Sequence, residues 1–469
     1  MFLAFVVLIT AFWGCSRHQV TLDVAPAVKG DTHYTAAPPD ADQKKATLSA
    51  PPKQAWWYAF DNPELTRMIT LSLSNNQDVV QALERLRQAN RLIPQTRSSR
   101  YPQINLEGDP SYTLDGTDRD RSDWQIGAAL EWEIDAFNRI GAAVNSDRFE
   151  ALASAEDLQA LQLTISADVA FAYFGAVAAH HTLDLLDQQV RIDKTLLDLL
   201  ELRFTNGVGT RVEVMQQQSR VADSESLIPP AQANLRVFEN RLDVLLGQMP
   251  DGQNRVSRAS GLDIAATLPP IGVPADLLMN RPDLRAAKAS LIASDFDIEA
   301  AIADRLPRLT LDGTAAYADA PGSAGVLSVI MGSFVQPLLD WGRRKAFVEQ
   351  QQARYQERLA AFTQAYLVAV EDVENTLYRE NRQREFIVRL EKRIRLLNAT
   401  LDETEARYSQ GVDDYLPVLN ALQELRELER DLITQRLALV EFRITLHRAT
   451  GGAMESLPRI DNLQTGTAS

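Results

Sequence analysis

A run of 68 residues, from Arg343 to Gln410, contains neither glycine nor proline. Those two residues cost about 1 and 3 kcal/mol in a helix interior, so the run predicts one continuous helix, roughly 100 Å long at 1.5 Å per residue. Its apolar residues recur in alternating steps of three and four, which is typical of a coiled-coil seam. Glu380 and Arg384 occupy two seam positions in the middle. The apolar seam positions are Tyr355, Leu359, Phe362, Tyr366, Val370, Val373, Leu377, Ile387, Leu390, Ile394, Leu397, Leu401 and Tyr408.

The turn that ends this run occurs twice in the chain. Arg407–Val412 reads Arg-Tyr-Ser-Gln-Gly-Val, and Arg203–Val208 reads Arg-Phe-Thr-Asn-Gly-Val, with the two glycines 204 residues apart. Further matches at offsets of 204 or 205 are Gly247 with Gly451, Tyr101-Pro102 with Leu306-Pro307, and Asp135 with Asp340. The sequence therefore predicts a tandem duplication of one elongated unit of about 200 residues.

Composition argues against several classes of protein. The 469-residue chain has a net charge of −15, so nucleic acid is not an expected partner. No run approaches the roughly 20 apolar residues of a membrane-spanning helix. There is no Gly-x-Ser-x-Gly motif and no phosphate-binding glycine loop, so we expect no catalytic residues. We also expect no metal site, because the histidines lack helical ligand spacing with another His or Cys. The five are His18, His33, His180, His181 and His447.

The amino-terminal 15 residues resemble a bacterial lipoprotein signal. An apolar run from Phe2 to Trp13 precedes Gly14-Cys15-Ser16, and Cys15 is the only cysteine. The resemblance implies cleavage before Cys15 and covalent lipid, such as palmitate, on it, although no basic residue precedes the run. An earlier translation start, and an incidental cysteine, are the open alternatives. Residues 16–62 lack periodicity and predict an extended tether.

Residues 63–247 form the first predicted repeat. Asn62 is the expected cap of a helix that starts at Pro63 and ends at Pro94 or Tyr101-Pro102. Two strands with period two follow, and Trp124 and Trp132 lie near the ends of the second. The alternation fits a tilted membrane strand with an aromatic girdle, or a soluble hairpin with one buried face. A helix from about 142 to 206 then turns at 207–209, and its return helix must be kinked or interrupted at 229–230.

Residues 248–273 predict a linker, because they are rich in proline and glycine. Residues 274–452 form the second repeat. It contains a short helix capped by Asp283, a strand from Leu309, a poorly alternating strand over about 326–339, and the long helix. A return helix over 412–450 has Pro417 in its first turns, where proline is tolerated. Residues 453–469 are the expected flexible tail.

Each repeat supplies two long strands, so one chain has four. A closed membrane barrel needs at least eight strands, because an open edge leaves backbone groups unpaired in lipid. We therefore expect an oligomer, and a trimer with twelve strands is the simplest barrel with a hollow lumen.

The duplicated Arg-aromatic-x-x-Gly turns, Asn280–Leu284 and Asp340–Arg343 together make the chain resemble the TolC-like outer-membrane efflux factors, in the lipoprotein branch of OprM and NodT. The resemblance covers Trp56 to Gly452. It implies a mainly α fold in which long coiled-coil helices form a trimeric α-barrel tunnel beneath a 12-stranded β-barrel, set in the bacterial outer membrane and extending into the periplasm. The implied partners are a periplasmic adaptor (membrane fusion protein) and an inner-membrane transporter of the RND type.

The same resemblance assigns roles to the predicted turns. The adaptor is expected to contact Gly207, Val208, Gly411 and Val412. In the family, acidic side chains ring a closed periplasmic gate near the inner ends of the return helices. Asn420 stands where an aspartate is expected, and acids one turn upstream are the candidate replacements. The gate candidates are Tyr408, Asp413, Asp414 and Asn420. The alternative is that the two acids are ordinary surface residues on an exposed turn.

Three functions are compatible with these features. The favoured interpretation is a passive duct that exports small toxic compounds through the outer membrane, with no enzymatic activity. A duct of the same fold for type I protein secretion is the nearest alternative. A periplasmic coiled-coil scaffold lipoprotein without a pore is the third, and the alternating strands with terminal tryptophans argue against it.

Overall fold

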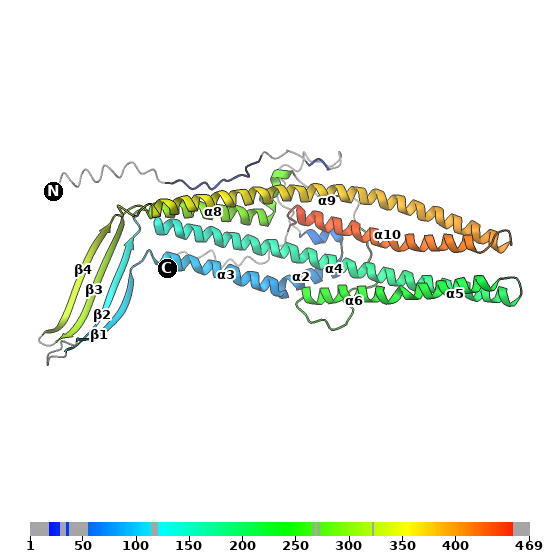
Figure 1. Ribbon diagram of the computed structural model, residues 1–469, viewed down its shortest axis with the longest axis horizontal. Coiled ribbons are helices and arrows are strands. Elements are labelled where there is room, and N and C mark those ends of the chain that lie inside the picture. Colours follow the sequence, from blue (N-terminus) through cyan, green and yellow to red (C-terminus); the bar gives the residue numbers. More distant parts are fainter. Residues whose placement is uncertain are drawn as a thin grey trace.

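The computed structural model describes residues 18–28, 34–36, 55–113, 121–264, 268–269, 273–320 and 323–453. It is a long bundle of helices with a four-stranded sheet at one end (Figure 1). The two longest helices, α4 (Arg139–Thr205) and α9 (Arg343–Ser409), have 67 residues each and begin where the second strand of each repeat ends. The predicted long helix from Arg343 is thus confirmed to within one residue.

The same order of elements occurs twice, as the duplication predicts. The first copy contains η2 (Trp56–Phe60), α2 (Pro63–Asn75), α3 (Gln77–Ser98), β1 (Gln103–Thr113), β2 (Arg121–Ile134), α4, α5 (Arg211–Ser226) and α6 (Ile228–Leu245). The second copy contains η3 (Pro274–Asp276), α7 (Leu277–Asn280), α8 (Pro282–Ala303), β3 (Arg308–Ala320), β4 (Ser323–Val335), α9 and α10 (Leu416–Ala449).

Local residue chemistry explains where the first helices begin. The Asn62 side chain accepts a hydrogen bond from the Leu65 amide, as predicted. The prediction of one unbroken helix after it is wrong, because Asn76 is extended and its side chain caps α3. Pro94 does not end the helix either; it lies inside α3, which continues to Ser98. Asp283 is not the cap of α8: Arg281 holds the N-cap position and donates to the Asp283 carboxylate.

The sheet is antiparallel throughout, in the order β1-β2-β3-β4. Register pairs such as Ile104 with Leu130 and Leu309 with Phe334 place apolar side chains on one face. The opposite face carries Glu107, Gln125, Glu131, Asp312 and Thr314 from β1, β2 and β3. β4 alternates poorly because it is apolar on both faces, which explains its weak sequence signal. Within the described residues, β1 and β4 each have one edge without a strand partner.

The helical body has its core where α4 passes α2, α3, α6 and α10. Trp57, Tyr173, Leu186 and Leu242 are fully buried there. By length and composition, α4 holds a stretch apolar enough to cross a membrane, and 72% of that stretch is buried inside the protein. The prediction that no such stretch exists is therefore wrong, since an alanine-rich core helix satisfies the same criterion. The return helix of the first repeat is interrupted between α5 and α6, at the predicted Pro229-Pro230.

Candidate functional site at the hairpin tips

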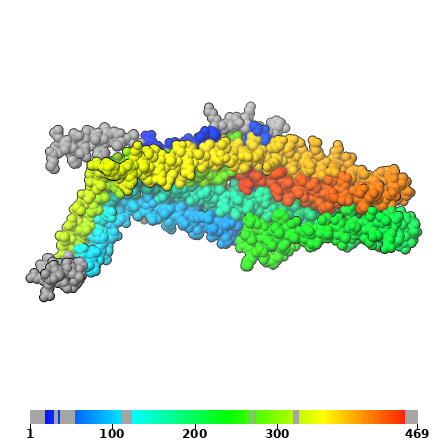
Figure 2. Space-filling view, viewed as in Figure 1, coloured from blue at the N-terminus to red at the C-terminus, as the bar shows by residue number. Residues whose placement is uncertain are grey.

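The two hairpin turns lie together at the end of the molecule remote from the sheet (Figure 2). They have the same backbone structure. In the first turn, the Val208 amide donates to the Arg203 carbonyl, and in the second, the Val412 amide donates to the Arg407 carbonyl, both at 3.0 Å. Gly207 and Gly411 have φ of +73° and +74°, and a Cβ there would meet nothing within 4 Å. Glycine is therefore required by the backbone and not by crowding.

The tip surface carries exposed apolar side chains. Val208 is 67% exposed and Val412 is 59% exposed, directly after the two glycines. Further exposed apolar residues of the first hairpin are Leu199, Leu202, Phe204, Val212 and Met215. All four predicted adaptor-contact residues are thus exposed in the two turns.

The second turn is fastened by an ion pair. Arg407 Nε lies 2.5 Å from Asp413 Oδ2, and the arginine holds the pKa of that carboxyl below its usual range. Asp414 and Asn420 are exposed on the same turn and on the first turns of α10. The first turn uses a different device, a capping box between Thr210 and Glu213. The turns therefore match in backbone and differ in the side chains that hold the return helix.

The two hairpins touch through aromatic residues just behind the turns. The Arg203 guanidinium lies 4.7 Å from the centroid of the Tyr408 ring. Tyr408 also packs on Tyr415, with ring centroids 5.4 Å apart. Burial raises the pKa of both phenols. Tyr408, which the sequence placed at the gate, is thus half of a cation–π contact between the repeats.

A buried polar network lies about 20 Å behind the first turn, at 1.5 Å per helical residue. Asp193 of α4 is fully buried, and its Oδ1 accepts from Arg426 Nη1 of α10 at 2.5 Å. Its Oδ2 accepts from Ser224 Oγ at 2.7 Å, and Gln217 Nε2 donates to its backbone oxygen at 2.9 Å. The Tyr415 hydroxyl donates to Gln217 Oε1 at 2.7 Å. One buried carboxylate therefore joins α4, α5 and α10.

Two more polar contacts flank this network along α10. Arg220 of α5 donates to Gln423 at 2.7 Å, and Arg430 donates to Gln189 of α4 at 3.0 Å. These polar contacts lie beside an apolar cluster that both hairpins share. Sequence reasoning missed the network. The available signal was Asp193, a charge between the buried seam residues Val190 and Leu200.

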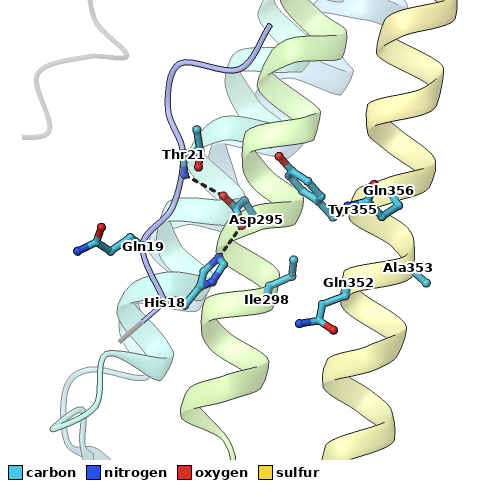
Figure 3. Close-up of a pocket in the computed structure, with 9 residues that line it drawn as sticks. All are labelled: His18, Gln19, Thr21, Asp295, Ile298, Gln352, Ala353, Tyr355 and Gln356. Carbon is cyan, nitrogen blue, oxygen red and sulfur yellow. Dashed lines mark hydrogen bonds and ion pairs between the residues drawn. The ribbon is translucent and has the colours of Figure 1, made fainter. Parts of the chain in front are cut away.

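A second cluster joins the described amino-terminal segment to α8, with α9 alongside (Figure 3). His18 Nε2 lies 2.6 Å from Asp295 Oδ1, and the Thr21 amide donates to Asp295 Oδ2 at 2.8 Å. Further along, the Ala36 amide donates to Glu374 Oε2 at 2.8 Å. These carboxylates hold the segments 18–28 and 34–36 against the outside of the helical body. Cys15 lies outside the described residues.

No group of three or more His, Cys, Asp or Glu side chains in the described ranges is arranged to hold a metal ion. The hairpin tips combine a contact surface with exposed valines and an interface between hairpins that contains paired charges and buried hydrogen bonds. Strands that are apolar on one face and polar on the other, next to long helical hairpins, are typical of a membrane β-strand protein with a helical body.

Comparison with known proteins agrees with that class. Residues 68–248 and 273–452 match the family described as outer membrane efflux protein. The pyoverdine export outer membrane protein OpmQ of Pseudomonas putida is 28% identical over 90% of this chain and 93% of its own length. The probable outer membrane lipoprotein SilC of Salmonella typhimurium is 24% identical, over 85% and 87%. The solved structure of the outer-membrane channel OprN superposes with a TM-score of 0.80, at 26% identity, over 92% of this chain and 98% of that one.

The chain belongs to the outer membrane efflux protein family. It is an outer-membrane protein that serves in efflux, with the TolC-like fold that the motifs predicted. Those predictions of family, fold, function and location are confirmed.

Proposed function

We propose that three copies of this chain form one continuous duct, with a 12-stranded barrel in the outer membrane and a helical tunnel in the periplasm. The observation that carries the proposal is the sheet: four antiparallel strands with an unpaired edge at β1 and another at β4, apolar on one face. Lipid does not tolerate unpaired strand edges, so β1 of one copy pairs with β4 of the next.

The chain is divided accordingly in this proposal. Residues 1–15 are the lipoprotein signal and 16–62 the amino-terminal segment. The end of this segment is not an extended tether as predicted, because η2 buries Trp56 and Trp57 in the core. Residues 63–247 and 274–452 are the two repeats, joined by 248–273, and 453–469 are the tail. Lipid on Cys15 anchors the duct to the membrane that holds the barrel. The contact of His18 with Asp295 supports this, because Asp295 lies on the helix that leads into β3. Loss of labelled palmitate from Cys15→Ala tests the attachment.

The tips receive the other components of a tripartite system. A periplasmic adaptor contacts Gly207, Val208, Gly411 and Val412, and links the duct to an inner-membrane transporter of the RND type. The exposure of both valines beside positive-φ glycines supports this assignment. Alanine at Gly411 would strain the turn, and the adaptor would then co-purify less well with the duct.

The tips also contain the gate. Tyr408, Asp413, Asp414 and Asn420 line its periplasmic entrance, and the network around Asp193 keeps the second hairpin against the first. Opening requires α10 to move away from α4 and α5. In a trimer each acid occurs three times around one axis, which favours cations.

Single-channel recording of Asp413→Ala with Asp414→Ala tests the gate. We expect a higher conductance or a weaker cation preference, because negative charge is lost from the entrance. Asp402→Ala with Glu403→Ala is the matched control, since these adjacent acids are also exposed but lie two turns before the tip. Recordings equal to those of the unmodified protein would remove Asp413 and Asp414 from the gate.

The transported material is a set of small toxic compounds, and the protein itself catalyses no reaction. The family match and the absence of nucleophile and phosphate-binding motifs support this. Deletion of the chain should sensitise cells to a panel of toxic compounds. A normal toxicity profile with loss of a secreted protein would instead favour the secretion duct.

A further inference from the structure

The connection between β4 and α9 lies at the junction of sheet and helices (Figure 1). Three large apolar side chains are exposed in it. Leu338 is 91% exposed, Leu339 is 73% exposed and Trp341 is 90% exposed. Nothing in the duct or the hairpin tips uses them. A cluster of this kind marks an interaction surface, because a soluble surface seldom leaves leucine and tryptophan uncovered side by side.

The turn holds Trp341 in a fixed and costly conformation. Its φ is 54°, in the left-handed region that a bulky residue rarely adopts. The Asp340 carboxylate accepts from the Gly342 amide at 3.1 Å and the Arg344 amide at 3.2 Å, which fixes the turn. A conformation that costs free energy and presents a tryptophan outward points to a function for that side chain.

The first repeat shows that the duplicated fold does not require this exposure. There the Asp135 carboxylate accepts from the Ile140 amide at 3.0 Å and the Gly141 amide at 2.8 Å, so the same kind of cap starts α4. The turn is one residue longer, and Phe137 in it is only partly exposed. The exposed tryptophan therefore belongs to the second repeat alone.

The surroundings of the turn indicate what covers it. The apolar face of the sheet, which meets lipid in the proposed barrel, reaches Phe334 of β4, four residues before Leu338. Three exposed cationic side chains surround the same junction: Arg305, Arg343 and Lys345. Tryptophan prefers the headgroup level of a membrane, and arginine and lysine there contact lipid phosphates.

We propose that Leu338, Leu339 and Trp341 contact the phospholipid headgroup region of the periplasmic leaflet, with Arg343 and its neighbours facing the phosphates. This contact fixes how deeply the barrel is inserted in the membrane, from its periplasmic side. In the proposed barrel β1 of the next copy lies beside β4, so a contact of this turn with that copy is the alternative that the test distinguishes. The proposal rests on the proposed membrane barrel and adds a second, non-strand contact with lipid.

Photocrosslinking of the full chain in phospholipid vesicles tests it. Benzoylphenylalanine replaces Trp341 in one sample and Val208, an exposed tip residue, in the other. We expect a phospholipid adduct, detected by mass spectrometry, at position 341 and none at position 208. An adduct joining two copies through position 341, or a protein without lipid adduct there, would overturn the proposal.

A second measurement uses variants that the turn tolerates. Trp341→Gly suits the positive φ and Trp341→Phe keeps an aromatic ring. In vesicles that contain phospholipids brominated near the headgroup, both should lower the quenched fraction of tryptophan fluorescence. An unchanged or larger quenched fraction would count against the contact. Single-channel conductance should stay unchanged in both variants, so loss of the pore, which would sink the proposed function, is a distinguishable result.

Discussion

Two fully buried carboxylates, one in each hairpin, are neutralised in different ways. Asp193 of the first hairpin pairs with Arg426, which belongs to the second hairpin. Glu380 of the second hairpin pairs with Arg384 and Arg443, which belong to the same hairpin. Both carboxylates are fully buried. One pair therefore joins the two hairpins, whereas the other holds a single hairpin together.

This difference assigns the two pairs to different tasks. A contact between hairpins can be broken while each hairpin stays folded, which is what opening of the tip requires. A contact within one hairpin cannot open without damage to the seam of α9 and α10. In the proposed gate, opening would therefore break the pair of Asp193 with Arg426 and leave the cluster of Glu380 intact.

Arg426→Met should have the largest effect. Among the residues that the structure describes, Asp193 has no other cation partner, and breaking a buried pair costs about 3–5 kcal/mol. Thermal unfolding should show the loss, and single-channel conductance should rise because α10 is released. The double variant Asp193→Asn with Arg426→Met should recover much of the stability, since no buried charge remains. A stable variant with normal conductance would contradict the gate assignment.

The second-largest expected effect is a loss of folding stability in acid, at the end of the second hairpin. Burial, with a smaller contribution from Arg443, lowers the pKa of His447 to about 4. Its unfolded pKa is higher, so the stabilisation is complete at neutral pH and is lost as pH falls from about 6.5 to 4. At 1.36 kcal/mol per pKa unit, the loss is about 3 kcal/mol.

Unfolding curves measured across this pH range check the prediction, with His447→Gln as the comparison. The variant should lose part of the pH dependence but not all of it, because burial also lowers the pKa of His180 in the first repeat. An identical pH dependence in both proteins would show that His447 stays neutral in folded and unfolded chains alike.

Arg443→Met should cost less than Arg426→Met. Arg384 remains beside Glu380, with Nη2 2.9 Å from Oε1, so only the hydrogen bonds of Arg443 to the charge are lost. We expect about 2 kcal/mol of destabilisation in thermal unfolding, with unchanged conductance. If this variant opened the channel as readily as Arg426→Met, the distinction between the two pairs would fail.

Tyr415→Phe should have the smallest effect of the series. It removes the hydrogen bond to Gln217 at 2.7 Å, which is worth about 1 kcal/mol. Tyr408→Phe is the control, because the buried Tyr408 hydroxyl has no hydrogen-bond partner in the described part of the chain. Equal unfolding temperatures for the two variants would separate Tyr415 from the buried network.

The sequence predicted those features that local chemistry determines. α9 was predicted almost to the residue, because Gly342 and Gly411 bound a stretch without helix breakers. Both tip turns and the strands β1 to β3 followed from glycine placement and alternation. The break at Asn76 was missed, because a capping asparagine looks like any polar residue on a helix surface.

The buried networks could not be predicted in the same way. The apolar spacing places Glu380 in the seam of α9. Its partner Arg443 is 63 residues away in the sequence, and no local pattern links the two. Asp193 and Arg426 are 233 residues apart in the sequence. They meet only because α10 of the second hairpin packs against α4 of the first. Likewise, the exposure of Trp341 follows from a turn whose φ values no local pattern specifies.

The central claim is that the outer edges of β1 and β4 are sealed only when copies of the chain join. Native mass spectrometry of the protein released from outer membranes tests it most directly. We expect a complex of three copies, each close to the 52.2 kDa of the full sequence before processing. A monomer that remains folded and inserted in the membrane would contradict it.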